Sequence, residues 1–486
     1  MTIASAFQNA MSGLRAAGHA TDVIASNISN ANTPGYARRV LELSSTSLSN
    51  SGGVTVSGIT RMVDPGLIAA RRSAQADFGF SQIISDFTSS FESALGTPDD
   101  PRALTNLIAD FDASLLSASS RPDAPERLDV AIDAARTLVQ AINESSNSVS
   151  DMRSAADGSI DAQVTRLNAA LEEVKYLNIQ ISEIRISGQD DSAMIDLRQV
   201  LIDEIYEIVP VHQSSRENGK VALYTEGGIV LLDGNAAEVS FSPTRTVTPY
   251  MTLSGGHLSG LTVNGNSINV GSENSDVPGG TLAAQFAIRD ELGEDALLQL
   301  DATARNLVER FQDPTVDSTL LAGDAGLFTD QGAAFDALDE VGLAERLMLN
   351  SSVDPSQGGE AWRLRDGLGA VTSGPTGQAA LLDTLRDTLN EREVPASGDF
   401  GTGALSLSDL ANGLMGRVGV QRLSADQSLS FTSAALHETS QAERADGVDT
   451  DTELQNLILV EQNYAANARM IETINRMMDT LMGLGA

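Results

Sequence analysis

The sequence predicts a multidomain, mainly α protein, in which a terminal coiled coil and a long helical bundle carry an inserted β-rich outer domain. Apolar residues recur at alternating steps of four and three at both ends of the chain, which is typical of a helix that packs against one partner helix. Helical periodicity continues through most of residues 64–209, and from Val211 the pattern changes to short strands and turns. At 486 residues the chain is long enough for about two to four domains.

The two terminal stripes have the same spacing. The N-terminal stripe consists of Ile3, Phe7, Ala10, Leu14, Ala17, Thr21, Ile24 and Ile28. The C-terminal stripe consists of Leu457, Val460, Tyr464, Asn467, Ile471, Ile474, Met478 and Leu481. Two narrow apolar seams at opposite ends of one chain can satisfy each other, so we expect the two helices to pair. The alternative is that each is an amphipathic helix docked on a globular body.

Both seams contain small or polar residues that weaken a helical pair. Ala10, Ala17, Thr21 and Asn467 occupy seam positions, and a two-helix contact of this composition gains little from packing. We therefore expect both ends to be mobile in a free monomer and to become ordered on assembly.

A cluster of turn residues ends the first helix. Pro34 keeps Thr33 out of the helical region of backbone space, and Gly35 permits a positive φ in a tight turn. Residues 52–59 then alternate between apolar and small polar residues, as a short strand does. A brief extended segment is therefore expected between the terminal helix and the rest of the chain.

Residues 64–209 are expected to be helical almost throughout, with a break at 97–101. Helical patterns return at residues 282–311 and from about residue 407 to 439. Helices of this length exceed the globular mean of about 11 to 12 residues, which is typical of a rod-like bundle.

The β-rich domain is expected after Val211. Two hairpins are predicted, formed by residues 221–225 with 229–232 and by residues 261–263 with 268–270. Asn264 and Gly265, between the second pair, favour a two-residue hairpin turn.

Residues 313–400 are rich in Gly, Asp and Pro, and we expect irregular structure that completes the β-rich domain. Along the sequence, the rod segments flank the β-rich insertion and the terminal helices flank the rod segments. The chain is therefore expected to run along the rod in one direction and to return in the other. Both ends should therefore lie together, with the β-rich domain furthest from them.

These patterns divide the chain into three expected domains. They are a terminal coiled-coil domain of residues 1–45 and 450–486, a helical rod domain of residues 46–209, 281–312 and 401–449, and a β-rich outer domain of residues 210–280 and 313–400.

The composition argues against several classes of function. The chain has 31 basic and 66 acidic residues, for a net charge of -35, so nucleic acid and anionic membranes are not expected partners. It has no cysteine, which excludes disulfides, thiolate metal sites and cysteine nucleophiles. No run of roughly 18 apolar residues and no cleavable secretory signal are visible.

No catalytic, cofactor-binding or metal-binding residue is assigned, and no cofactor is expected. The four histidines lie in different segments without a second ligand at metal spacing. The acidic cluster around Asp449 lacks the features of a calcium loop. Thr450 and Glu453 have the spacing of a capping box, which explains the cluster as the start of the last helix.

The motif at the end of the first helix resembles a known family. The run Ser26-Asn27-Ile28-Ser29-Asn30-Ala31-Asn32-Thr33-Pro34-Gly35-Tyr36 is similar to the signature of the axial proteins of the bacterial flagellum. Residues 10–17 and 447–481 resemble the two ends of the same family. We take as its assembly motif Asn27, Asn30, Asn32, Thr33, Pro34, Gly35 and Tyr36.

Three further features are similar to the hook-associated protein 1 family among these axial proteins. They are the segments at 52–54 and 61–65, the long helical region after them, and the segments at 282–292 and 326–328. The resemblance implies a structural, non-enzymatic protein of the junction between hook and filament. Its terminal helices would form an antiparallel coiled coil that lines the channel of a helical tube.

The resemblance also implies partners and a location. Each subunit would associate with copies of itself in a helical ring, with the hook protein and with the second hook-filament junction protein. A cytoplasmic chaperone would hold the C-terminal helix before export. The flagellar type III apparatus would export the chain without cleaving a signal, so that it ends outside the cell in the flagellum.

Two alternatives remain open from the sequence. The shared ends also fit the hook protein itself or another rod or hook component. The β insertion at 211–280 fits a secreted surface enzyme or adhesin that uses flagellar export ends, because outward-facing insertions can acquire binding roles.

Overall fold

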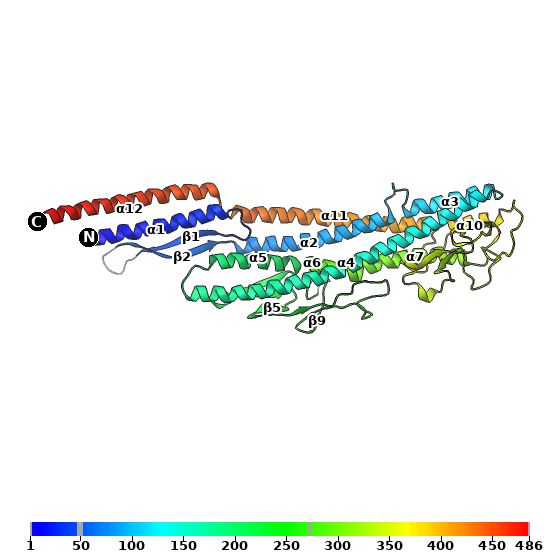
Figure 1. The fold of residues 1–486 in the computed structure, drawn as a ribbon, viewed down its shortest axis with the longest axis horizontal. Helices are drawn as coiled ribbons and strands as arrows, with labels where there is room; N and C mark the ends of the chain where they lie inside the picture. Colours follow the sequence, from blue (N-terminus) through cyan, green and yellow to red (C-terminus); the bar gives the residue numbers. More distant parts are fainter. Residues whose placement is uncertain (1, 46–51, 272–274, 485–486) are drawn as a thin grey trace.

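Long helices give the molecule an elongated shape (Figure 1). The computed structural model describes residues 2–45, 52–271 and 275–484. Parts of all three expected domains lie outside the described residues, namely residues 1, 46–51, 272–274 and 485–486. The described chain begins and ends at the same end of the rod, in agreement with the nested order of the segments.

Two antiparallel helices form the terminal end of the molecule. Helix α1 spans Ile3–Asn30 and helix α12 spans Thr450–Leu484, so both predicted terminal helices are confirmed. The two helices lie side by side over much of their length (Figure 1). The side chain of Thr2 caps α1 by accepting a hydrogen bond from the N–H of Ser5 at 3.3 Å.

A β-hairpin connects α1 to the rod. Strand β1 spans Arg38–Ser45 and pairs antiparallel with strand β2, which spans Val54–Met62, with a β-bulge between Glu42 and Leu43. The sequence predicts an extended segment here, and the structure adds that it folds back on a second strand.

Eight segments form the rod and confirm the predicted helical regions. They are α2 (Pro65–Leu95), α3 (Leu104–Ser120), α4 (Pro125–Ile186), α5 (Ser192–Ile208), α6 (Gly280–Ala287), the π-helical turn η2 (Ile288–Leu292), α7 (Gly293–Gln312) and α11 (Leu407–Ala445). Asp64 caps α2 through the N–H groups of Gly66 and Leu67, and Pro65 occupies its first position. A capping box between Ser406 and Asp409 starts α11.

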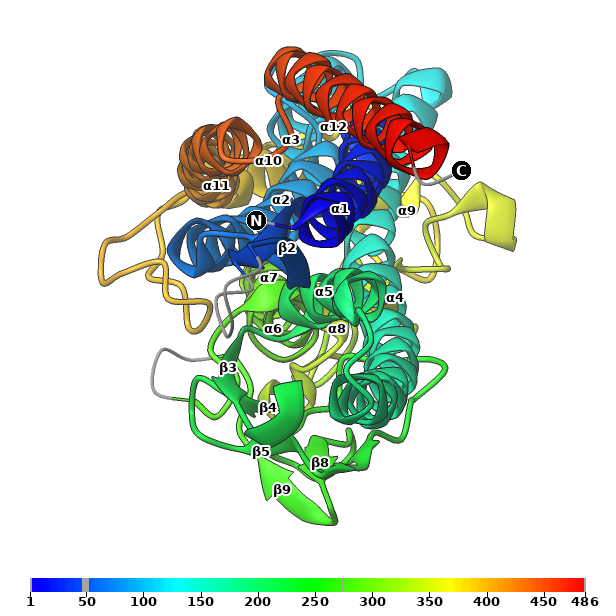
Figure 2. The same ribbon diagram turned by 90° about the vertical axis from the view of Figure 1, so that its left-hand side faces the viewer.

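Short antiparallel sheets lie along the side of α4 and α5 (Figures 1 and 2). One sheet contains β3 (Val211–Ser215), β4 (Val221–Thr225), β5 (Val230–Asp233) and β6 (Asn235–Ala236), with the 3-10 turn η1 (Glu217–Gly219) after β3. The other contains β7 (Val239–Ser240), β8 (Leu261–Val263) and β9 (Asn266–Ile268). Both predicted hairpins are present, but β9 lies at Asn266–Ile268 and not at the expected residues 268–270. Asn264 and Gly265 have φ angles of 50° and 79° at the second turn.

Residues 313–400 differ from the expectation that they complete the β-rich domain. They form β10 (Phe328–Asp330), η3 (Ala337–Asp339), α8 (Leu343–Arg346), β11 (Leu347–Leu349), η4 (Pro355–Gln357), α9 (Arg363–Asp366) and α10 (Ala380–Asn390). Strands β10 and β11 form a two-stranded sheet that is separate from the sheets of β3–β9. The physical reason is a shared core with the rod, since the ring of Phe328 lies 5.9 Å from that of Phe111 and 5.2 Å from that of Phe311.

The described rod contains two large apolar cores, and α4 contributes to both. Its first half, from Leu128 to Val149, packs with α3, α7 and residues 327–389. Its second half, from Ile160 to Val174, packs with α5, α6 and the sheets of β3–β9. The end of the molecule furthest from the termini is formed by α3 and by part of residues 313–400, including α10, whereas the sheets of β3–β9 lie along the middle of the rod (Figure 1). The expectation that the β-rich domain lies furthest from the termini is therefore wrong for residues 210–280.

Two buried arginines join the loops of the second sheet to the rod. Arg289 Nη1 lies 2.7 Å from Asp157 Oδ1, and its Nη2 donates to the carbonyl of Ser259 at 2.9 Å. Arg153 donates to the carbonyls of Arg289 at 2.7 Å and Met251 at 2.8 Å. Burial lowers the pKa of Arg153, and the carbonyl oxygens supply the partners that a buried cation needs.

The fold is thus mainly α with small antiparallel sheets. Within the part of the chain that the structure describes, no helix combines the length and apolar character needed to cross a membrane.

Candidate assembly site at the base of the terminal helices

Asn27, the first residue of the motif, is 1% exposed. Its Nδ2 donates to the carbonyl of Arg39 at 2.9 Å, and its Oδ1 accepts from the N–H of Arg39 at 2.9 Å. The same Oδ1 accepts from the Tyr36 hydroxyl at 2.8 Å. The amide of Asn27 therefore pairs with the backbone of β1 and fixes the direction in which the chain leaves α1.

The remaining motif residues build the turn between α1 and β1. Asn30 Nδ2 donates to the carbonyl of Ser26 at 2.9 Å, and Thr33 Oγ1 donates to Asn30 Oδ1 at 3.2 Å. The Tyr36 and Ser26 hydroxyls lie 3.2 Å apart. By contrast, Asn32, Thr33 and Pro34 are exposed, so the motif has an inner and an outer set of residues.

Gly35 allows the turn to press against α5. Its φ is +75°, which favours glycine. A Cβ at this position would lie 2.5 Å from Val200 Cγ2 and 3.1 Å from the carbonyl oxygen of Asp196. Both the backbone angle and the close approach therefore require glycine.

Two arginines fasten the hairpin to α5 through one carboxylate. Arg39 Nη2 lies 2.7 Å from Asp196 Oδ2, and Arg61 Nη2 lies 2.7 Å from Asp196 Oδ1. The guanidinium of Arg39 also lies over the ring of Tyr36, with 4.8 Å between Cζ and the ring centroid. The motif, the hairpin and the rod are therefore parts of one polar network.

The same hairpin holds the start of α12. Arg38 Nε lies 2.7 Å from Glu453 Oε1, and Glu453 is 1% exposed. The expected capping box of Thr450 and Glu453 is wrong, because Glu453 points to Arg38. Asp449 caps the helix instead and accepts from the N–H of Asp451 at 3.0 Å and the hydroxyl of Thr452 at 2.7 Å.

The pKa of Asp449 agrees with this role. The hydrogen bond from the Thr452 hydroxyl lowers the pKa of the Asp449 carboxyl, with further contributions from the N–H groups of Asp451 and Thr452. The charged form is the one that accepts these hydrogen bonds, so they favour ionisation.

A second set of ion pairs joins α2 to α5 and α11 next to the hairpin. Arg71 Nη2 lies 2.6 Å from Asp203 Oδ2, and its Nε lies 2.5 Å from Glu443 Oε2. Arg72 Nε lies 2.6 Å from Asp203 Oδ1. Burial alone would lower the pKa of Arg71, but the charges of Asp203 and Glu443 outweigh it and raise the pKa.

Known protein families match three separate parts of the chain. The helical domain of the flagellar hook-associated protein FlgK matches residues 88–328. The flagella basal body rod protein family matches residues 7–36, and the C-terminal family of flagellar basal body rod FlgEFG proteins matches residues 440–484. The outer two matches contain the motif and Glu453 respectively.

Whole-chain relatives agree with these matches. Flagellar hook-associated protein 1 of Escherichia coli is 24% identical over 99% of this chain and 100% of its own length. Flagellar hook-associated protein 1 of Bacillus subtilis is 23% identical over 98% of each chain. The chain belongs to the FlgK family.

Membership of the FlgK family makes this chain a structural component of the bacterial flagellum that assembles with other axial components. A solved structure of the flagellar hook junction protein FlgK from Burkholderia pseudomallei has a TM-score of 0.41 and 18% identity, over 55% of this chain and 46% of that one. That likeness is too distant to support an inference.

The seam residues of this FlgK-family chain are covered to very different extents. Ile24 and Ile474 are buried, together with Ala10 and Ala17. The half-buried seam residues are Ile3, Leu14, Ile28, Leu457, Val460, Asn467 and Ile471. The exposed ones are Phe7, Thr21, Tyr464, Met478 and Leu481. The pairing of α1 with α12 therefore covers only part of the apolar surface of these two helices.

Gly13 of α1 lies against the side chain of Asn467 in α12, a contact that the sequence did not predict. A Cβ at Gly13 would lie 2.8 Å from Asn467 Nδ2. Asn467 is a seam residue, so this contact lies within the seam between α1 and α12.

Helix α12 also exposes a second apolar flank beside the seam. Leu459, Met470 and Met477 are exposed on it, and their spacing places them on one side of the helix. Exposed apolar residues gathered on one helix mark an interaction surface.

The sequence reasoning missed the charged residues that hold the site together. These are Arg38, Arg39, Arg61, Asp196 and Glu453. The pair Arg38-Arg39, directly after the motif in an acidic chain, was the one available signal.

Proposed function

We propose that this chain forms the junction between hook and filament of the bacterial flagellum, as one layer of a helical tube. The observation that carries the proposal is the antiparallel α1–α12 pair with an uncovered apolar flank on α12, at the end of the rod where the chain begins and ends. The name hook-associated protein 1 that its relatives carry supports it.

In this proposal the terminal pair is a coiled coil that lines the central channel. The exposed flank of α12 packs against neighbouring subunits, because exposed apolar side chains gain free energy when they are removed from water. Residues 1–50 contain two acidic and three arginine residues, so the N-terminal ends of neighbouring subunits can approach one another without strong repulsion. The acidic remainder of the chain faces the solvent.

The motif has two roles in this account. Asn27, Asn30 and Tyr36 fix the turn inside the subunit, and exposed Asn32, Thr33 and Pro34 contact a neighbouring subunit. Gly35 sets the distance between the turn and α5.

Three regions follow from the proposal. Residues 1–45 and 450–486 form the terminal domain, and residues 210–280 form the β-rich outer domain. Residues 46–209, 281–312 and 401–449 form the rod, which residues 313–400 join through the core around Phe111.

Export and partners are part of the same proposal. The flagellar type III apparatus exports the chain without cleavage, and a cytoplasmic chaperone covers the exposed apolar flank of α12 before export. The hook protein and the second hook-filament junction protein are the axial partners on either side. The role involves no catalytic turnover.

Deletion of the gene in the motile source strain tests the proposal. The expected result in electron micrographs is that hooks remain without filaments, while filament protein is shed into the medium as monomer. Loss of the hook itself would instead support the alternative role as hook protein. Normal filaments would exclude both roles.

A further inference from the structure

Exposed methionines gather near the end of α12. Met470, Met477, Met478 and Met482 are between 46% and 72% exposed, and we call these four residues the methionine patch. Elsewhere in the described chain, the exposed methionines are Met62 and Met348. Because the sequence has no cysteine, methionine supplies the sulfur that an oxidant can attack.

The methionine patch belongs to both apolar surfaces of α12. Met470 and Met477 lie on the exposed apolar flank beside the seam. Met478 is a seam residue, and together with Met482 it lines a hollow of about 500 Å³ that is also lined by Phe7 of α1. A change in the polarity of the patch therefore affects the pairing of α12 with α1 and also the uncovered flank.

A small oxidant can reach the patch in a free monomer. The four side chains are exposed, so no conformational change is needed to bring the oxidant to them. Hydrogen peroxide is uncharged, so the net charge of -35 does not repel it. Once a neighbouring subunit covers α12, the same side chains become less accessible.

Oxidation changes what these side chains can pack against. A hydroperoxide transfers one oxygen atom to the thioether sulfur, so that the O–O bond breaks and an S–O bond forms. The sulfur loses two electrons, and hydrogen peroxide is reduced to water. The resulting sulfoxide is polar and needs water or a hydrogen-bond donor, so its burial in an apolar contact is unfavourable.

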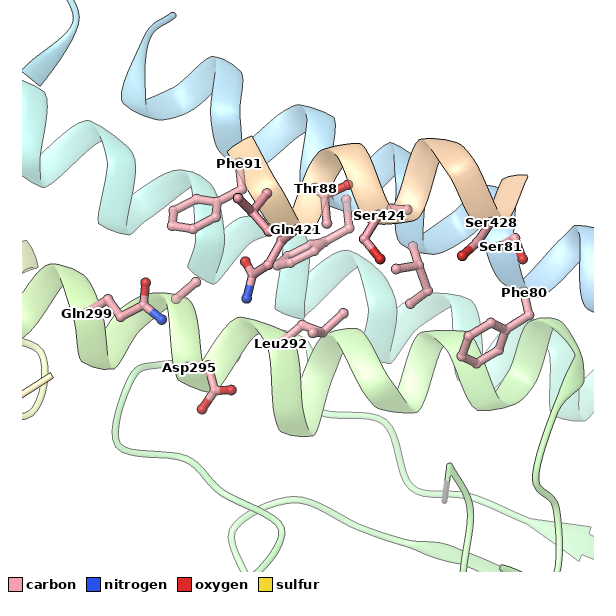
Figure 3. A pocket seen from close by; sticks show the side chains of 15 residues that line it. Phe80, Ser81, Thr88, Phe91, Leu292, Asp295, Gln299, Gln421, Ser424 and Ser428 are labelled. Carbon is pink, nitrogen blue, oxygen red and sulfur yellow. The ribbon is translucent and has the colours of Figure 1, made fainter. Parts of the chain in front are cut away.

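The apolar surface of the rod differs from α12 in this respect. A hollow of about 470 Å³ between α2, α7 and α11 is lined by Phe80, Phe91 and Leu292, among others, and none of its lining residues is a methionine (Figure 3). Peroxide treatment therefore leaves this surface chemically unchanged. Its effect on apolar contacts is concentrated on the terminal helices.

We propose that the methionine patch is a peroxide-sensitive modification site that controls incorporation of the subunit. A chain with thioethers in the patch assembles, and a chain with sulfoxides there does not. The inference rests on the proposed function, since that function assigns contacts between subunits to α12. The flexible side chain of methionine adapts to several partner surfaces, and its sulfur makes the same contacts oxidisable. Methionine sulfoxide reductases restore the thioether, so the modification is reversible.

Binding to isolated hooks tests the inference. The purified full-length chain is treated with hydrogen peroxide, and mass spectrometry of its peptides locates the sulfoxides. Treated and untreated chains are incubated with hooks from the deletion strain, and an antibody against the rod measures the bound copies. The oxidised chain should bind in about tenfold lower number or less. Treatment with the two methionine sulfoxide reductases, one for each sulfoxide epimer, should restore binding.

Two matched variants show which methionines are responsible. Leucine replaces all four residues of the methionine patch in the first variant, and it replaces Met62 and Met348 in the second. Leucine keeps the apolar character and approximate volume of methionine. The first variant should bind hooks equally well before and after peroxide treatment, whereas the second should stay as sensitive as the wild type. Circular dichroism of each chain, before and after treatment, checks that it is folded.

Several results would overturn the inference. They are equal binding of the oxidised and untreated wild type, equal sensitivity of the two variants, a loss that the reductases do not reverse, and a patch that stays reduced while Met348 is oxidised. If the untreated wild type does not bind to hooks, the proposed function itself fails and the inference fails with it. A failure of the inference alone leaves binding of the untreated chain intact, which distinguishes the two cases.

Discussion

Arg38 and Glu453 lie 415 positions apart in the chain, yet Arg38 Nε is 2.7 Å from Glu453 Oε1. Arg38 begins the hairpin that follows α1, and Glu453 lies in the first turn of α12. This ion pair therefore joins the two ends of the chain where they meet the rod.

Arg38→Ala should loosen the start of α12. The substitution leaves the almost fully buried carboxylate of Glu453 without its partner, which costs about 2 kcal/mol or more. Amide exchange around residues 450–457 should become faster than in the wild-type monomer. Arg476→Ala is the control, because Arg476 and Glu472 form an exposed pair at 3.8 Å and its loss should cost less than about 0.5 kcal/mol. Equal effects of the two substitutions would show that the Arg38–Glu453 contact does not hold the helix.

Asn27→Ala should destabilise the connection between α1 and the rod. The change removes three hydrogen bonds of a buried amide and leaves the backbone groups of Arg39 without these partners. The expected loss in free energy of unfolding is about 2 to 4 kcal/mol. Asn32→Ala, at an exposed position of the same motif, should change it by less than about 0.5 kcal/mol. Urea unfolding of the purified monomers measures both values, and a loss below 1 kcal/mol for Asn27→Ala would contradict the structural role, on the scale of about 1 kcal/mol per hydrogen bond.

The stability of the rod should depend on the protonation of Asp301. Burial raises the pKa of its carboxyl to about 6, although hydrogen bonds from the N–H groups of Ala344 and Gly342 act in the opposite direction. The folded-state pKa lies above the unfolded one, so the folded chain binds this proton more tightly. The resulting stabilisation is present below about pH 4 and is lost as the pH rises to about 6.

Asp301→Asn isolates this dependence from that of the other carboxyl groups. The stability of the wild type minus that of the variant should fall by about 2 to 3 kcal/mol between pH 4 and pH 7. Urea unfolding of both proteins over this range gives the difference. A difference that does not change with pH would show that the pKa of Asp301 is close to its unfolded value.

The helices and hairpins follow from local patterns in the sequence. The alternating steps of four and three predict α1 and α12, and Asn264-Gly265 predicts the turn between β8 and β9. Both signals act over a few residues, so the rest of the fold does not need to be known.

The contacts of the site could not be predicted in the same way. Glu453 has the spacing of a capping residue. Only in the folded chain does Arg38 lie close enough to form an ion pair with Glu453, which replaces the capping contact. Residues 313–400 have the composition of loops, but Phe328 packs against Phe111 and Phe311 of the rod. Composition indicates irregular backbone there without showing which core the apolar residues enter.

The terminal helices should exchange amide hydrogens faster than the rod in a free monomer. None of the apolar clusters in the described chain includes a residue of α1 or α12, and the seam contains Ala10, Ala17 and Asn467. A pair held by so little packing opens readily. Exchange measured by mass spectrometry should show weak protection in residues 3–30 and strong protection in residues 128–174 of α4. Equal protection in the two regions would mean that the pair is stable without assembly.

Incorporation of a chain that lacks residues 454–486 tests the central claim most directly. The full-length and truncated chains are expressed in the deletion strain, and electron micrographs with an antibody against the rod are scored at the hook tip. The account predicts that the full-length chain is present there and supports a filament, whereas the truncated chain is folded but absent from the tip, without filaments. Secretion of the truncated chain into the medium is monitored, so that failed export is not mistaken for failed assembly. Normal incorporation of the truncated chain would contradict assembly through the terminal helices.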